Sequence, residues 1–150
     1  MFDQKNIPEV KIGLLAVSRD CFPIALSRRR RQAVAAACQK LNLPVIELET
    51  IIENEKDGLK ALEEIKQKGI NALAIYLGNF GPEGPTTMVA QKFGGPVMLA
   101  AAAEETGADL FDGRGDAYCG VLNASYSVGL RQLKVHIPEY PVGTADEVAR

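Results

Sequence analysis

The chain has 150 residues, 47% hydrophobic and 24% charged, as expected for one globular domain, and its formal net charge of −2 provides no positive field for nucleic acid. No apolar run approaches the ~18 residues of a membrane helix, and the first residues lack the basic and apolar regions of a signal peptide. We therefore expect a cytoplasmic protein with three reduced cysteines that binds neither nucleic acid nor a membrane.

The first predicted element is a strand over residues 10–17, because this run is short and almost continuously apolar. A helical pattern follows over residues 26–42, in which Val34 and Cys38 lie one turn apart on the apolar stripe. Residues 45–48 then predict a second, short strand.

Helices and strands continue to alternate along the rest of the chain. Residues 55–68 place leucine and isoleucine on one face and charged side chains on the other, with Gly69 at the C-cap position. The remaining predicted strands are 71–77, 96–101 and 135–138, and the remaining predicted helices are 86–93 and 120–133.

Residues 141–150 contain a Pro/Gly turn and then the beginning of a helical pattern. We interpret them as an exit segment toward a further domain, with residues 1–140 as the α/β domain itself. A short terminal helix is the alternative interpretation.

Strands that alternate with helices predict right-handed βαβ units and a parallel sheet with helices on both faces. We expect a single doubly wound α/β domain, flavodoxin-like or Rossmann-like, with three layers and five parallel strands in the order 2-1-3-4-5. Ligands bind such sheets beyond the carboxyl ends of the strands. The loops at that edge are 18–23, 78–85, 102–105 and 112–120.

Aromatic and polar side chains are concentrated in these loops, where packing alone would not demand Phe22, Phe80 or Tyr118. Rings beside carboxylates, amides and an arginine suit a sugar, because a ring face covers C–H groups and polar groups bind hydroxyls. Packing of the loops onto the domain is the alternative. Neither G-x-G-x-x-G nor G-x-x-x-x-G-K-[ST] follows the first strand, so we expect no dinucleotide or nucleoside triphosphate.

Two other groups of charged residues could carry chemistry. Carboxylates gather at Glu104, Glu105, Asp109, Asp112 and Asp116. Because His136 is the only histidine, we expect no complete metal site within this chain. The basic run 28–31 opposes a helix macrodipole and indicates either an interface with acidic partners or a solvated face.

Several stretches of the chain resemble the N-terminal domain of the L-fucose isomerase family, a group of L-fucose and L-arabinose isomerase-like sugar isomerases. The matching stretches are 11–13, 76–83 (YLGNFGPE), 95–104, 116–120 and 129–131. After the third strand this chain has Asn79 and Phe80 where the best-known fucose isomerases have tryptophan and tyrosine. The resemblance therefore does not identify the sugar.

The resemblance implies an aldose–ketose isomerisation, in which a divalent metal, usually Mn²⁺, polarises the substrate oxygens while carboxylates move a proton. In that family the metal ligands and the acid/base carboxylates lie in later domains. This implies that our chain contains no catalytic residue, cofactor site or metal ligand, and has little activity by itself.

The family's N-terminal domain helps to close the active site of a neighbouring subunit through the loops after its first and third strands. The resemblance therefore implies a homo-oligomer, contact with the remaining isomerase domains, and binding of the sugar substrate. The implied substrate contacts are Arg19, Asp20, Asn79, Phe80 and Glu83.

Two other functions stay open on the sequence. The chain could be a stand-alone sugar-binding or regulatory module that uses the same edge. It could also be a small independent enzyme that uses the carboxylates of Glu104, Glu105 and Asp116. Either function requires the chain alone to bind a sugar tightly or to turn one over.

Overall fold

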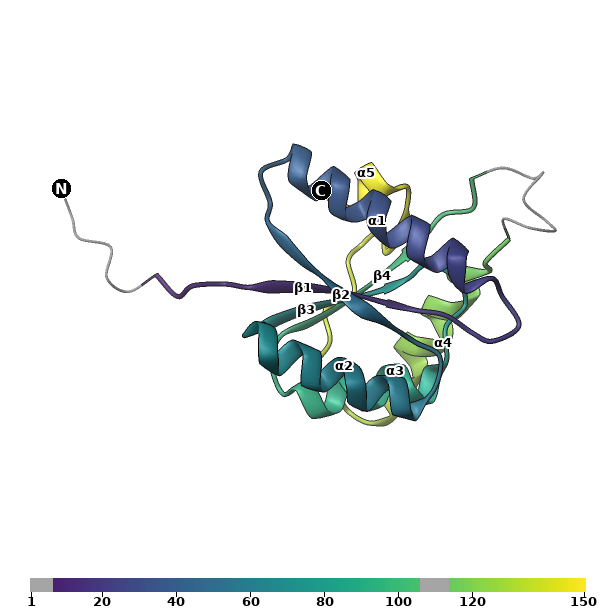
Figure 1. Ribbon diagram of the computed structural model, residues 1–150. Coiled ribbons are helices and arrows are strands. Elements are labelled where there is room, and N and C mark those ends of the chain that lie inside the picture. The colour runs from purple at the N-terminus through teal and green to yellow at the C-terminus, as the bar shows by residue number, and fades with distance from the viewer. Residues whose placement is uncertain (1–6, 106–113) are drawn as a thin grey trace.

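The computed structural model describes residues 7–105 and 114–150 (Figure 1). The elements in chain order are β1 (Ile12–Val17), α1 (Ile24–Lys40), β2 (Val45–Ile52), α2 (Glu55–Lys68), β3 (Ala72–Leu77), α3 (Glu83–Phe93), β4 (Val97–Ala102), α4 (Ala117–Leu130), β5 (Val142–Gly143) and α5 (Ala145–Val148). Among the described helices, none has the length and apolar character needed to cross a membrane.

The strands form one parallel sheet in the order β2-β1-β3-β4-β5, which confirms the predicted topology. Figure 1 shows α1 and α5 on one face of this sheet and α2, α3 and α4 on the other. Within each layer the neighbouring helices contact one another, α1 with α5 and α3 with both α2 and α4. The predicted three-layer α/β architecture is therefore confirmed.

The middle strands are covered on both faces, which explains their almost continuous apolar sequences. Leu15 and Ile75 in β1 and β3 are fully buried, and the core continues to Leu99 in β4. The edge strand β2 runs to Ile52, four residues beyond the prediction. Its middle contains Glu49 and Thr50, and this polar interruption hid the second half of the strand from a search for apolar runs.

Local signals explain where several helices begin and end. The side chain of Asn54 accepts hydrogen bonds from the N–H groups of Lys56 and Asp57, at 3.0 and 3.1 Å, and so caps α2. Gly69 ends the same helix with a φ of 66°, as predicted. Helix α3 begins three residues before the predicted start, because Pro85 lies in its first turn, where a missing N–H costs nothing.

The prediction of the fifth strand at residues 135–138 is wrong. His136 forms only an isolated bridge with Met98, and the paired strand is Val142–Gly143. Pairing with β4 is interrupted after His136 and resumes where Ala101 N–H donates to the carbonyl of Pro141 at 2.7 Å. Pro138 and Pro141 lack the N–H group that a continuous ladder requires, so the edge strand is broken.

Residues 142–148, within the predicted exit segment, form the last strand and helix of this same domain. The predicted alternative, a short terminal helix, is present as α5, which is capped by Thr144 and contacts α1. That the segment leads toward another domain stays a prediction.

Candidate functional site

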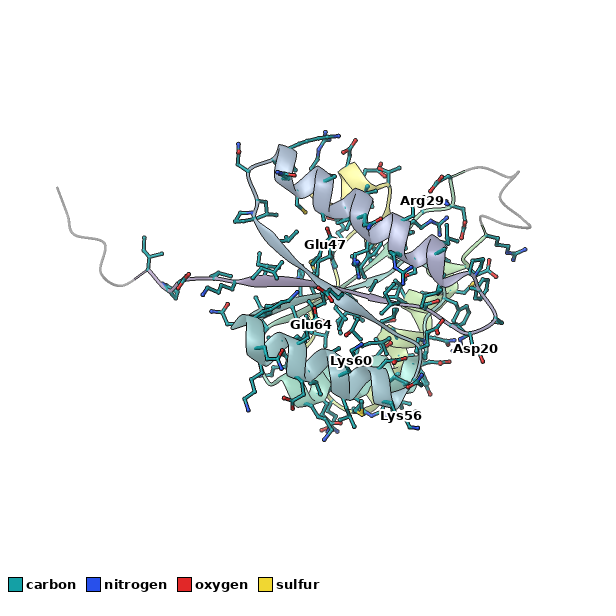
Figure 2. All side chains as sticks on the ribbon, in the orientation of Figure 1. Asp20, Arg29, Glu47, Lys56, Lys60 and Glu64 are labelled. Atoms are coloured by element: carbon teal, nitrogen blue, oxygen red, sulfur yellow. The ribbon has the colours of Figure 1, made fainter. Side chains whose placement is uncertain are left out.

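The carboxyl ends of three neighbouring strands meet at one edge of the sheet. Val17 at the end of β1 pairs with Leu77 of β3, and Leu77 pairs with Ala101 of β4. The loops that follow these strands therefore start side by side. Asp20, labelled in Figure 2, marks the loop after β1, and its side chain is exposed.

Asn79 joins the loops after β1 and β3, and its side chain is completely buried. Its oxygen accepts hydrogen bonds from the N–H groups of Arg19 at 3.0 Å and Gly81 at 3.3 Å. Its nitrogen donates to the Ser18 hydroxyl at 2.9 Å and to the Pro23 carbonyl at 3.5 Å. Both ends of the amide are thus used within the protein, so Asn79 fixes the two loops relative to each other.

Next to Asn79 lies a group of half-buried side chains that we name the loop cluster: Arg19, Phe22, Phe80 and Glu83. The Arg19 guanidinium lies 4.4 Å from the centre of the Phe80 ring, a cation–π distance. It also donates to the Gly81 carbonyl at 3.1 Å and forms an ion pair with Glu83. The rings of Phe22 and Phe80 are nearly parallel, with centroids 6.3 Å apart.

The first turns of α3 and α4 complete this side of the edge. Glu83 is the first residue of α3, and its second carboxylate oxygen lies 3.5 Å from the Asn123 amide of α4. Helix α4 approaches closely because Gly120 has no side chain, and an added Cβ would lie 2.0 Å from the Phe80 carbonyl oxygen. Four of the five predicted contact residues, Arg19, Asn79, Phe80 and Glu83, are thus brought together, with Asp20 exposed beside them.

A second group of side chains, which the sequence reasoning missed, lies on the α1 side of the same edge. Arg30 is 4% exposed, and its guanidinium donates to the Gly78 carbonyl at 2.8 Å and to Glu104 at 2.9 Å. The other Glu104 oxygen accepts the N–H groups of Gly115 and Asp116, at 3.0 and 2.8 Å. Glu104 therefore ties α1 to the start of α4.

The interpretation of the basic run 28–31 as a solvated face holds for only half of the run. Arg28 and Arg29 are exposed, but Arg30 and Arg31 are buried and paired with carboxylates of this same chain. Arg31 lies 3.0 Å from Glu47 on β2. The periodicity contained this signal, because Arg30 precedes Val34 by four residues and so lies on the stripe that faces the core.

Within the described part of the chain, the carboxylates that the sequence gathers here do not form a metal centre. Among residues 7–105 and 114–150, no three His, Cys, Asp or Glu side chains lie close enough together to hold a metal ion. Asp116 pairs with Arg114 at 2.6 Å, and His136 is exposed and bridges to Met98 of β4. Asp109 and Asp112 lie outside the described residues. The described donor sets therefore do not fit Mn²⁺.

The chemistry that this edge offers is binding. Arg19 and Asp20 provide a cation and an anion for hydrogen bonds to hydroxyl groups, and the Phe80 ring provides an apolar face. Glu83 is engaged by Arg19, and Glu104 by Arg30 and two backbone N–H groups, so neither carboxylate is a free base. Because Glu104 is engaged in this way, it is not available as a catalytic base. This disfavours the hypothesis of an independent enzyme that uses Glu104, Glu105 and Asp116.

Among solved structures, the chain is similar to the lac repressor dimer bound to operator and an anti-inducer, with a TM-score of 0.44 and 9% identity, over 89% of this chain and 47% of that one. It is also similar to an ABC transporter solute-binding protein from Bacillus halodurans C-125 with bound myo-inositol, with a TM-score of 0.39 and 7% identity, over 89% and 56% of the two chains. The chain thus spans only about half the length of these proteins. No curated protein matches it.

One family model matches nearly the whole domain. It describes the N-terminal domain of fucose/sulfoquinovose isomerase and covers residues 13–150, from β1 through α5 and including every residue of the loop cluster. The resemblance stated from the sequence motifs is therefore confirmed at the level of the family. The chain belongs to the fucose/sulfoquinovose isomerase N-terminal domain family.

Proposed function

We propose that this chain is the substrate-facing and oligomerisation domain of a metal-dependent aldose–ketose isomerase of the L-fucose type. The loop cluster carries this proposal. Its Arg19 guanidinium and Phe80 ring are half-buried, held in one geometry, and located at the edge where sheets of this topology bind ligands. A rigid arginine over an aromatic ring suits a polyhydroxylated substrate with one apolar face.

The metal in this proposal comes from the other isomerase domains. Members of the family are generally metal-dependent, and Mn²⁺ is expected for the complete enzyme, where it would polarise the oxygens of the sugar. No step of the reaction is assigned to the residues of this chain. Arg19, Asp20, Phe80 and Glu83 would orient the sugar and exclude water, and Asn79 would hold their loops in place.

Helix α4 provides a surface for the proposed oligomer. Tyr118, Leu122, Tyr126 and Leu130 follow one another at intervals of four residues and are 53–67% exposed. The sequence of α4 contains no charged side chain from Ala117 to Leu130. Because α4 also contacts the loop cluster through Asn123 and Gly120, a subunit seated on this face would lie beside the proposed substrate site.

The substrate role is tested by Arg19→Ala in the complete isomerase, with kcat, KM and bound metal measured together. Loss of a charged hydrogen bond to the sugar should raise KM by about tenfold, while metal content stays unchanged. Arg28→Ala removes an exposed arginine away from the loop cluster and should leave both constants unchanged. Unaltered kinetics in Arg19→Ala would remove Arg19 from the substrate site.

The oligomerisation role is tested by Leu122→Glu, with sedimentation velocity as the measurement. A charge in the middle of the α4 face should shift the protein toward smaller species. Leu59 on α2 is the matched control, because it is 52% exposed against 53% for Leu122. Equal assembly states for Leu59→Glu and Leu122→Glu would show that α4 is not the subunit contact.

A stand-alone sugar-binding module is the alternative proposal, and it differs in one measurable respect. It requires the chain alone to bind a monosaccharide tightly, whereas a domain that completes a shared active site binds only weakly without its partners. Calorimetric titration of the chain with L-fucose separates the two. We also propose a cytoplasmic location.

A further inference from the structure

A cavity lies on the α1 side of the sheet, separate from the loop cluster. It has a volume of about 410 Å³, and its walls come from α1, from the carboxyl end of β4, and from the segment that joins β5 to α5. Arg29, labelled in Figure 2, lies at its rim on α1. The size is that of a small-molecule site rather than a packing defect.

The cavity exists because most of its lining side chains are small. Ala33, Ala102, Ala103 and Ala145 contribute methyl groups, and Gly143 contributes only backbone. Ala102 is 4% exposed and belongs to the sheet, so the floor of the cavity is rigid. Methyl groups on a rigid floor present an apolar surface that suits the C–H face of a small ligand.

Tyr76 also lines this cavity and brings a hydroxyl group to it. The side chain is 2% exposed and projects from the middle of the sheet. Burial raises the pKa of Tyr76 above its ordinary value, and the charges that act on the hydroxyl are those of Arg30 and Glu105, which line the same cavity. The Tyr76 hydroxyl is thus a hydrogen-bond donor and acceptor in the wall of this cavity.

The charged groups of the wall balance one another. Arg30 lies 2.9 Å from Glu104 and 3.7 Å from Glu105, and Arg29 lies 3.9 Å from Glu105. Among the described residues of the wall, two positive and two negative side chains favour neither an anion nor a cation. They offer both donors and acceptors to a neutral ligand, and both kinds bind hydroxyl groups.

We propose that this cavity is a second binding site, for a neutral polyhydroxy compound of monosaccharide size. The Tyr76 hydroxyl contacts the ligand from the sheet, the arginine and glutamate side chains bind its hydroxyls, and the alanine methyl groups cover its C–H face. The site is distinct from the loop cluster, with which it shares no residue. It goes beyond the proposed isomerase role and does not depend on it.

The alanine methyl groups allow a direct test on the 150-residue chain. With ¹³C-labelled alanine methyls and phenylalanine rings, the chain is titrated with L-fucose and with D-sorbitol to about 50 mM, because small neutral ligands bind open cavities in the millimolar range. Resonances of Ala102, Ala103 and Ala145 should shift and saturate. Sodium acetate and ethylammonium chloride, as charged probes, should not shift them.

Two variants connect any binding to the cavity. Tyr76→Phe removes only the hydroxyl and should weaken the affinity by about fivefold, with the unfolding midpoint unchanged or raised. Ala33→Leu narrows the cavity from its exposed rim and should weaken binding further. Ala36→Leu, an exposed position on α1 outside the cavity, is the matched control and should bind as the unmodified chain does.

Each other outcome counts against the site. It is overturned if the sugar and sorbitol leave these alanine methyls unmoved, if Tyr76→Phe and Ala33→Leu bind as tightly as the control, or if a charged probe gives equal shifts. Shifts confined to the Phe22 and Phe80 rings would support the loop cluster and overturn the cavity, so the two sites are distinguished within one titration.

Discussion

The buried and the half-exposed parts of the carboxyl edge lie in the same two loops but use their polar atoms differently. Asn79 is fully buried and its amide is hydrogen-bonded at both ends within the chain. Arg19 is 31% exposed and lays its guanidinium over Phe80. Residues of the same two loops can therefore have different roles. We propose that Asn79 positions the loops and that Arg19 contacts the ligand.

The largest effect is expected from Asn79→Ala. The substitution leaves the N–H of Arg19 and the hydroxyl of Ser18 without their present partners inside the protein. Buried polar groups that lose their partners should lower the free energy of unfolding by about 3 kcal/mol in urea denaturation. If stability is unchanged while L-fucose binding is lost, Asn79 is a contact residue and the distinction between the two parts fails.

A smaller loss of stability, about 2 kcal/mol, is expected from Arg30→Met. Arg30 is 4% exposed, and its removal leaves the Gly78 carbonyl and Glu104 without their guanidinium partner. Glu104 is 37% exposed, and hydration of its carboxylate offsets part of the cost. Arg28→Met, an exposed position on the same helix, should stay within about 0.5 kcal/mol of the unmodified chain. Similar values for the two variants would contradict the structural role of Arg30.

Arg19→Lys should change stability by less than about 1 kcal/mol, because its ion pair with Glu83 is partly exposed to solvent. Lysine keeps the charge but loses the planar group that lies over Phe80 and reaches the Gly81 carbonyl. We therefore expect KM of the complete isomerase to rise while its unfolding midpoint stays constant. If Arg19→Lys lowers the stability as much as Arg30→Met does, Arg19 has a structural role like that of Arg30.

The strand order and the gathering of the loops at the carboxyl edge could be predicted from the sequence, because both follow from the alternation of apolar strands and helices. Which side chains at that edge are buried and which are partly exposed could not be predicted from the sequence. Asn79 and Phe80 are adjacent in the sequence, and only the packing of the loops shows that one is buried and the other half-exposed. Arg30 could have been placed from its helical spacing to Val34, but its partner Glu104 is 74 residues away.

The fifth strand illustrates a different limit. The apolar alternation around His136 is typical of a strand, and this residue does bridge to Met98. The following prolines remove N–H donors, and pairing moves to Val142, where the sequence signal is only two residues long. A pattern of side chains predicts which face is buried, whereas the count of available backbone donors decides where a ladder can continue.

The last prediction concerns Glu64, which lies at the opposite, β2 edge of the sheet and, like Glu104, accepts two backbone N–H groups and pairs with a basic side chain. Its carboxylate accepts the N–H groups of Glu49 and Thr50, at 2.7 and 3.1 Å, and pairs with Lys68 at 2.9 Å. Burial alone would raise the pKa of Glu64, but the hydrogen bonds from Lys68 and the two N–H groups lower it to about 2.

A pKa lowered in the folded state means that the unfolded chain binds the proton more readily. Stability from Glu64 is therefore complete above its ordinary pKa of 4.5 and is lost as the pH falls toward 2. Glu64→Gln should cost about 1 kcal/mol at pH 7 and should flatten the acid side of the stability profile, measured by urea denaturation from pH 7 to about 3. Glu63→Gln, an exposed neighbour on α2, is the control. If the free energy of unfolding falls with pH in the same way for both variants, Glu64 does not hold the edge strand through its charge.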